Sequence, residues 1–275
     1  KTQLSPEYFE LCAEFLKNLA DIAPTYIILG NHDGNLKNDS RQDAITPVIE
    51  ALQHPNLFLL KNSGETQLTD SICLNVLSVF DRDNWVTPTD KSMVNIALYH
   101  GAIMGCEINE EWNLDHGEDD INIFTNFDYA MLGDIHKTQK LDPDGRVWYA
   151  GSTVQQNFGE SLLKGYLLWD IRDKDNFNIE KRLFMSPRPF YTVEINQDGT
   201  LPKVDVPKNS RLRLVSNYNL PLVKLRMACD YANAKWNPYS INFVNRAGYS
   251  ESATVHQDGK TINMRDQNTQ EKYIK

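Results

Sequence analysis

Three apolar stretches of this chain run straight into residues that can bind a metal ion or move a proton. They read TYIILGNHD (25–33), VNIALYHG (94–101) and DYAMLGDIH (128–136). The polar residues at their ends are Asn31, His32, Asp33, His100, Asp134 and His136. Because the carboxyl ends of parallel strands meet at one edge of an α/β sheet, where such folds place ligands, we expect these side chains to converge.

Helical and strand patterns alternate along residues 1–186. Ser5-Pro6-Glu7 is typical of a helix start. The apolar residues that then share one helical face are Phe9, Cys12, Ala13, Phe15, Leu16 and Leu19. A second helix is expected over 41–53, with strands over 25–29, 57–60, 72–79, 94–101, 128–136, 147–153 and 165–171. This alternation predicts a layered α/β core.

A second module is expected after Pro187-Arg188-Pro189. Strands over 190–195, 211–215 and 240–244 and a helix over 221–234 form a small α+β pattern across 187–250. Residues 251–275 are polar and lack periodicity, so a tail or linker is expected there.

Charge is divided unevenly between these modules. Residues 1–186 carry 15 Lys+Arg and 29 Asp+Glu, a net charge of −14, whereas residues 187–275 carry 13 and 8, a net charge of +5. The overall charge of −9 argues against indiscriminate nucleic-acid binding. An acidic body with a basic second module indicates different partners for the two.

The four cysteines are scattered without a CxxC pair, which favours reduced thiols in an intracellular protein, cytoplasmic or nuclear. No run approaches the roughly eighteen apolar residues of a spanning helix, so no membrane partner is expected. The chain opens on Lys1 without a signal peptide, and a targeting segment upstream stays open as an alternative.

Imidazole, carboxylate and amide oxygen donors together suit Mn, Fe or Zn. A lone histidine after a strand, such as His100, is more often a core or cap residue, and Asn-His-Asp-Gly alone is compatible with a simple turn. Three such strand ends in one chain favour a metal site over these alternatives. The histidines in polar loops, His54, His116 and His256, are interpreted as surface residues.

GNHD, a later strand ending in His-Gly and a later Gly-x-x-His resemble the calcineurin-like metallophosphoesterases. The stretches YAGSTVQQNFGE and KGYLLWDI, with the basic α+β module after them, resemble the SbcD-type nuclease subunits of double-strand-break repair. The resemblance covers about residues 1–245. It implies a layered calcineurin-like phosphoesterase β-sandwich flanked by helices, followed by a small α+β capping domain.

The resemblance also implies roles by position. Asn31, His100 and the residue at 134 would ligate one metal ion, and His136 the other. His32 would steer the scissile phosphate and help protonate the leaving oxygen, and Asp33 would hold the tautomer of His32. Two Mn²⁺ ions are expected in the complete site, with Mg²⁺ as an alternative.

Two departures from the family pattern matter. Family members usually have Gly-His-x-His where this chain has Gly-Asp-Ile-His, and Asp134 would favour Mn or Mg more than an imidazole. The family's Asp-x-His and its bridging Gly-Asp do not precede residue 31. From the motif spacing we expect some forty to fifty residues to be absent upstream. The 275-residue chain alone is therefore expected to hold at most one tight ion and to cleave little.

The sequence therefore predicts a metal-dependent DNA nuclease that acts with an SMC-like ATPase subunit and forms a homodimer. The cations expected to touch DNA are Arg188, Lys203, Lys208, Arg211, Arg213, Lys224 and Arg226. Two alternatives stay open. One is a phosphoesterase acting on a nucleotide, lipid or phosphoprotein, and the other is a catalytically inactive scaffold that binds DNA ends.

Overall fold

The computed structural model describes residues 5–38, 41–108, 114, 117, 119–247, 254–257 and 260–263. The chain divides into two compact units. Unit 1 comprises residues 1–154 and 163–184, and unit 2 comprises residues 155–162 and 185–275. The sequence places one boundary after residue 186, but the short segment 155–162 belongs with unit 2. The side chain of Gln155 bonds to the backbone of Phe190, which ties this segment to unit 2.

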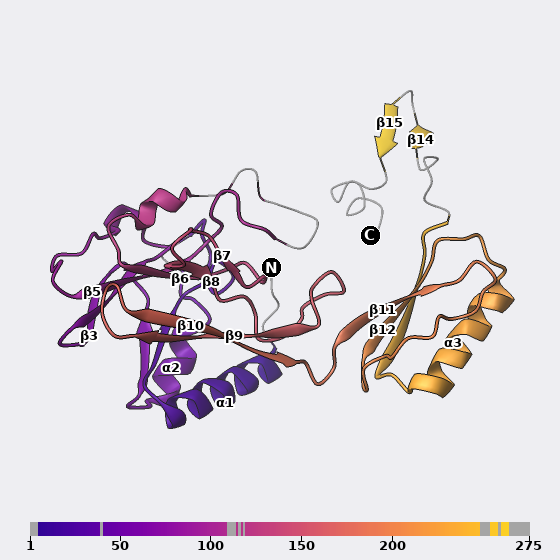
Figure 1. Cartoon of the computed structure of the whole chain (residues 1–275), viewed down its shortest axis with the longest axis horizontal. Coiled ribbons are helices and arrows are strands. Elements are labelled where there is room, and N and C mark those ends of the chain that lie inside the picture. Colours follow the sequence, from indigo (N-terminus) through magenta and orange to yellow (C-terminus); the bar gives the residue numbers. More distant parts are fainter. Residues whose placement is uncertain are drawn as a thin grey trace. The chain divides into compact units, whose positions relative to one another are not determined.

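The centre of unit 1 is a six-stranded sheet (Figure 1). Its strands, in spatial order, are β3 (Gly64–Thr69), β4 (Ile72–Leu77), β5 (Val94–His100), β6 (Tyr129–Gly133), β8 (Val147–Tyr149) and β7 (Gln139–Lys140). The four inner strands run parallel, and β3 and β7 join as antiparallel edges. Because β5 and β6 are parallel with His100 opposite Gly133, their polar ends lie side by side.

Two smaller sheets form a second layer on one face of this sheet. Strand β1 (Thr25–Ile28) pairs in parallel with β2 (Leu57–Leu60), and β9 (Leu163–Ile171) pairs with β10 (Phe177–Met185). Side chains from all four strands pack on the core around Ile96 and Tyr129. The result is a layered β-sandwich, consistent with a calcineurin-like phosphoesterase fold.

Helices α1 (Pro6–Ile22) and α2 (Thr46–Leu52) pack with β1 and β2 in a separate apolar cluster. The Ser5 hydroxyl accepts a hydrogen bond from the Tyr8 amide and caps α1, as the sequence predicts. The predicted buried face is partly wrong, because α1 buries Leu16 and Ala20 whereas Phe15 is 54% exposed.

Helix α2 begins at Thr46, later than predicted, because the Asp43 carboxylate takes up the amides at its start. Asp43 accepts from the backbone amides of Ile45 and Thr46 at 3.0 and 2.7 Å. Its other oxygen accepts from the Thr46 hydroxyl at 2.7 Å. These bonds satisfy donors that helix geometry leaves open and fix the chain that follows the GNHD loop.

The other face of the six-stranded sheet is covered by the segment between β4 and β6. This segment includes the short 3₁₀ turns η1 (Arg82–Asn84) and η2 (Ile121–Phe124). Its core is built around Tyr99 and Tyr149, both fully buried. The Tyr149 hydroxyl donates to the Gly101 carbonyl at 2.6 Å and accepts from the Ile103 amide at 2.9 Å.

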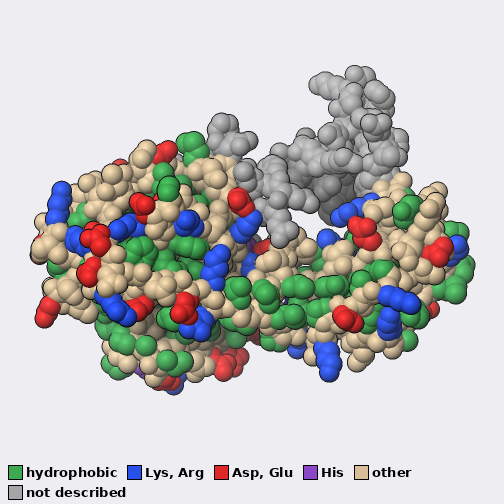
Figure 2. Space-filling view, in the orientation of Figure 1, with side chains coloured by type: hydrophobic (Ala, Val, Ile, Leu, Met, Phe, Trp, Pro, Cys, Tyr) green, Lys and Arg blue, Asp and Glu red, His purple; other side chains and the backbone are tan. Residues whose placement is uncertain are grey.

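Four of the five arginines in unit 1 lie close to a carboxylate. The ion pairs, with their shortest N–O distances, are Arg82–Asp119 (2.9 Å), Arg146–Asp175 (3.2 Å), Arg172–Asp170 (3.5 Å) and Arg182–Glu180 (2.5 Å). Figure 2 shows acidic and basic side chains interspersed over the visible face of this unit.

Unit 2 contains a three-stranded parallel sheet in the order β11 (Phe190–Ile195), β12 (Arg211–Ser216) and β13 (Ser240–Asn245). Helix α3 (Leu222–Trp236) packs on one face of this sheet through Leu225, Ala228 and Ala232. These elements match the predicted ranges to within two residues.

Three strands of unit 1, β3, β7 and β10, were not predicted from the sequence. Strand β10 is exposed along most of its length and lacks a regular apolar alternation. The predicted tail contains the antiparallel pair β14 (Thr254–Gln257) and β15 (Lys260–Asn263). Among the described residues, no helix has both the length and the apolar character needed to cross a membrane.

Candidate functional site

The GNHD loop leaves β1 as a tight turn closed by Asp33. Its carboxylate accepts from the Gly30 amide at 2.8 Å, and its own amide donates to the Gly30 carbonyl at 2.9 Å. No hydrogen bond between Asp33 and the His32 ring is found in the described part of the chain. The role of Asp33 in fixing the tautomer of His32 therefore stays a prediction, and the role that the structure gives Asp33 is to shape the loop.

The structure brings together Asn31, His100 and Asp134, one from each of the three strand ends. The Asn31 amide nitrogen donates to Asp134 Oδ1 at 3.1 Å, and His100 Nε2 lies 3.4 Å from the same oxygen. The Asn31 amide oxygen is buried and has no hydrogen-bond partner. A buried acceptor without a donor is costly, so this oxygen is a natural ligand position for a cation.

Two glycines make room for the His100 ring. A Cβ atom at Gly30 would lie 2.7 Å from His100 Cε1, and one at Gly133 would lie 2.7 Å from His100 Nδ1. Neither strand end tolerates a side chain there without moving the imidazole. Gly30 of GNHD and Gly133 of Gly-Asp-Ile-His therefore leave the space that the His100 ring occupies.

Asp134 has φ +92°, in the region that side-chain-bearing residues rarely adopt. Such a conformation persists only where the surroundings hold it, and it often marks a functional site. The hydrogen bond with His100 lowers the pKa of Asp134, against burial, which raises it. Asn31 and the charge of His32 add to the lowering, so both of the other strand ends act on this carboxylate.

His136 lies two residues beyond Asp134, in the loop that follows β6. Its backbone carbonyl accepts from the Lys164 ammonium at 2.7 Å. Lys164 is only 4% exposed and sits on β9, so it anchors the loop that carries His136. Sequence reasoning missed Lys164, although a lysine inside an otherwise apolar strand is a usable signal.

The donors fit one metal ion. An amide oxygen, an imidazole nitrogen and a carboxylate oxygen suit Mn²⁺ or Mg²⁺. In the described ranges, no group of three or more His, Cys, Asp or Glu side chains is placed to hold a metal, so the third donor of this trio is Asn31. A second ion at His136 would need ligands from elsewhere. His116 lies outside the described residues.

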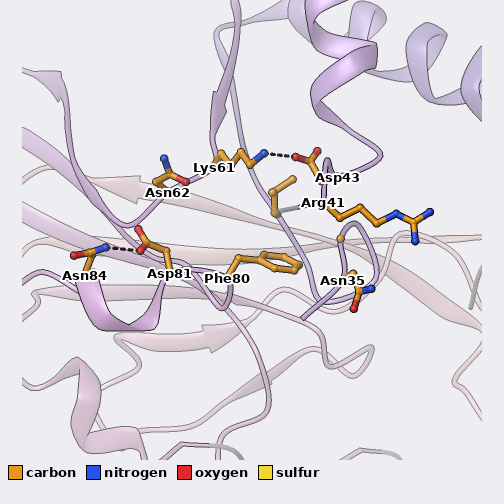
Figure 3. A pocket seen from close by; sticks show the side chains of 10 residues that line it. Asn35, Arg41, Asp43, Lys61, Asn62, Phe80, Asp81 and Asn84 are labelled. Atoms are coloured by element: carbon orange, nitrogen blue, oxygen red, sulfur yellow. Dashed lines mark hydrogen bonds and ion pairs between the residues drawn. The ribbon is translucent and has the colours of Figure 1, made fainter. Parts of the chain in front are cut away.

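A cavity of about 440 Å³ adjoins the GNHD loop (Figure 3). Leu29 and Gly34 line it on the loop side, with Lys61 and Asp81 among the residues around it. Asp81 accepts from the Ser63 amide at 3.0 Å and from the Asn84 amide nitrogen at 2.7 Å, so both of its carboxylate oxygens have hydrogen-bond partners.

The Asp43–Lys61 ion pair, at 2.7 Å, forms one wall of this cavity. Burial raises the pKa of Asp43, but the hydrogen bonds from Lys61 and Thr46 outweigh this effect. The resulting pKa is about 2, below the usual value of an aspartate. The pair is therefore charged under ordinary conditions and holds the start of α2 beside the loop.

The predicted DNA-contacting residues fall on different parts of unit 2. Arg211 and Arg213 lie on β12, and Arg188 precedes β11. Lys224 and Arg226 are exposed on α3, which covers the opposite face of the sheet. Lys203 and Lys208 are exposed in the connection between β11 and β12.

Comparison with curated proteins finds three informative similarities. An uncharacterised protein of Acanthamoeba polyphaga mimivirus is 35% identical over 227 residues, covering 78% of this chain and 16% of that protein. A protein of Invertebrate iridescent virus 6 assigned as a phosphoesterase is 24% identical over 222 residues, covering 73% and 72%. The SbcD subunit of the nuclease SbcCD from Staphylococcus epidermidis is 28% identical over 259 residues, covering 87% and 65%.

No family model matches the chain. The chain spans 16% of the mimivirus protein and 65% of the nuclease subunit. Two of these similarities are to a protein assigned as a phosphoesterase and to a nuclease subunit, which is consistent with hydrolase activity in general.

Proposed function

We propose that this chain is the hydrolytic part of a metal-dependent DNA nuclease. The observation that carries the proposal is the buried, partnerless Asn31 amide oxygen beside His100 and Asp134. These three residues would hold one Mn²⁺ or Mg²⁺. A bound ion supplies a Lewis acid that polarises a phosphodiester and lowers the pKa of a water molecule.

The residues of the chain would supply the remaining parts of the mechanism. His32 follows Asn31 directly, and in this proposal its imidazole faces the reacting phosphate. There it would donate a proton to the leaving oxygen. Asp33 would keep the loop in the turn that presents His32, and Gly30 and Gly133 would keep the His100 ring in place. His136 would belong to a second ion site.

DNA as the substrate is supported by the surplus of positive charge in residues 187–275 and by the similarity to a nuclease subunit. We also propose an SMC-like ATPase as a partner; the relative is one subunit of a nuclease, which supports a partner subunit in general.

A homodimer is supported by α1, where an exposed apolar stripe comprises Tyr8, Leu11, Phe15, Leu19 and Ile22. Sedimentation of the purified chain is expected to show a dimer that Leu11→Glu converts to a monomer. A wild-type monomer would contradict this part of the proposal.

The metal site is tested by titrating the 275-residue chain with Mn²⁺ and following the electron paramagnetic resonance signal of the free ion. We expect one tight ion per chain, and at least tenfold weaker binding in His100→Gln and Asp134→Asn. His54→Gln is the matched control, because His54 pairs with Asp21, away from the trio. Unchanged binding in both site variants would refute the assignment.

The reaction is tested in the native full-length protein with DNA and with bis-p-nitrophenyl phosphate as substrates. His32→Ala is expected to abolish cleavage of both while Mn²⁺ and DNA still bind. Turnover of the small ester without turnover of DNA would favour a phosphoesterase for small substrates. Wild-type binding of DNA with no turnover of either substrate would favour the inactive scaffold.

A further inference from the structure

Strand β12 of unit 2 presents arginines on one face and leucines on the other. Leu212 and Leu214 are fully buried in the core that includes Leu225 of α3. Because side chains alternate along a strand, Arg211 and Arg213 point to the face that α3 does not cover. The two neighbouring strands place Thr192 and Asn242 opposite Arg213 in register on this face.

Three guanidinium groups around this face lie over aromatic rings. Arg188 lies 4.2 Å from the ring centre of Tyr239, Arg211 lies 4.9 Å from that of Phe190, and Arg213 lies 4.4 Å from that of Phe158. The Phe158 and Phe190 rings meet edge to face at 4.9 Å. We call these three pairs the arginine–aromatic face.

The position of Arg213 is fixed by a hydroxyl rather than by a carboxylate. Its Nε and Nη2 donate to Thr192 Oγ1 at 3.2 and 3.0 Å, which leaves three of its five N–H donors available. Burial and the nearby charge of Arg246 lower the pKa of Arg213, so two cations share this region.

None of Arg188, Arg211, Arg213 and Arg246 forms an ion pair anywhere in the described portion of the chain. Guanidinium groups that stack on rings without a carboxylate keep their charge and most of their donors for an external anion. Several such groups on one face match a polyanion better than a single phosphate.

We infer that the arginine–aromatic face binds single-stranded DNA, with phosphates on the guanidinium groups and unpaired bases stacked beside the aromatic rings. The inference rests on the proposed function, which makes DNA the substrate. Single strands are favoured over duplex because exposed rings, such as that of Tyr239 at 56% exposure, can stack only on bases that are not already paired and stacked.

Helix α3 supplies a charge-matched control on the other side of the sheet. Lys224 and Arg226 are exposed there and carry the same charge as Arg211 and Arg213. If DNA binding depended only on net charge, the two pairs would contribute equally. The inference assigns binding to the sheet pair alone.

The test measures fluorescence anisotropy of a labelled oligo-dT with the full 275-residue chain over a range of salt concentrations. Arg211→Ala/Arg213→Ala is expected to weaken binding by more than about tenfold and to make its salt dependence less steep. Lys224→Ala/Arg226→Ala is expected to change affinity less than about twofold, because these residues lie on the helix side.

Two further variants separate stacking from charge. Arg211→Lys/Arg213→Lys keeps the charge and should recover only part of the affinity, and it replaces the alanine pair if that pair fails to fold. Tyr239→Leu should weaken oligo-dT binding several-fold without altering the salt dependence.

Equal losses in the sheet and helix variants, or tighter binding of a duplex of the same length, would overturn the inference. Turnover of bis-p-nitrophenyl phosphate by the native protein, measured in parallel, reports on the hydrolytic site alone. Failure of this inference is thereby distinguished from failure of the proposed function.

Discussion

Arginines in the two units differ in whether a carboxylate lies beside them. In unit 1, Arg82, Arg146, Arg172 and Arg182 each pair with a carboxylate. In unit 2, the three arginines of the arginine–aromatic face stack on rings instead. Exposed ion pairs add about 0–1 kcal/mol each and neutralise charge locally. An arginine beside a carboxylate is neutralised by it, whereas an arginine that stacks on a ring without a carboxylate can still bind an external anion. Unit 2 therefore keeps three of its arginines able to bind a phosphate.

The largest loss of stability is expected from a substitution on the buried side of β12. Leu214→Ala should lower the free energy of unfolding of unit 2 by about 2–5 kcal/mol, because it opens a cavity in a fully buried core. Arg213→Ala, on the opposite face of the same strand, should cost less than about 1 kcal/mol. Urea denaturation of both variants checks this. Comparable losses would mean that Arg213 is structural, which would break the comparison.

A smaller change in stability is expected from protonation of Asp43, a buried carboxylate in unit 1. The pKa of Asp43 is about 2 in the folded chain and 3.8 in the unfolded chain, so its ionised form stabilises the fold. That contribution, on the order of 2 kcal/mol, is fully present above about pH 4 and is lost as the pH falls through about 2.

The variant Asp43→Asn tests this directly. It should remove the acid-dependent part of the loss, so that its stability falls less steeply than that of the wild type between about pH 4 and 2. Thermal melts across this range measure the slope. Parallel curves for the two proteins would show that Asp43 does not carry the effect.

The smallest effect is expected at the surface of unit 1. Arg82 makes two bonds of 2.9 Å to Asp119 and lies 5.0 Å from the Trp85 ring centre, but its side chain is 41% exposed. After solvent screening, Arg82→Ala should cost no more than about 1 kcal/mol.

Arg82→Ala should also leave oligo-dT affinity unchanged, unlike the arginine pair on β12. Fluorescence anisotropy measures the oligo-dT affinity, and urea denaturation of the same protein sample measures the stability. A loss of DNA affinity equal to that of the β12 pair would show that paired arginines contribute to binding as well.

The sequence predicts the elements that end in polar residues, because a buried strand followed by glycine and histidine is a strong local pattern. It cannot predict that Asp134 adopts a positive φ or that Gly30 and Gly133 enclose His100, since both depend on the register of separate strands. The predicted convergence of Asn31, His100 and Asp134 is confirmed, whereas the metal ligation and catalytic roles stay predictions.

The sequence also grouped cations that the structure separates. Arg211, Arg213, Lys224 and Arg226 are close along the chain, but a strand and a helix place them on opposite sides of one sheet. The alternation of Arg211 and Arg213 with Leu212 and Leu214 is the signal that a strand-by-strand analysis uses to separate them. Strand β10 offered no such alternation, which explains why it was missed.

Asn31 differs from its two partners in how its supporting strand is held. Strand β1 is four residues long and is hydrogen-bonded to β2 in a two-stranded sheet, whereas β5 and β6 each have a strand on both sides. Small sheets open at low free energy, and interior strands open last. Transient opening of β1 would withdraw one ligand while the other two stay in place. The residence time of a bound ion would then follow the opening rate of β1, which amide hydrogen exchange at Ile27 and Ile28 reports.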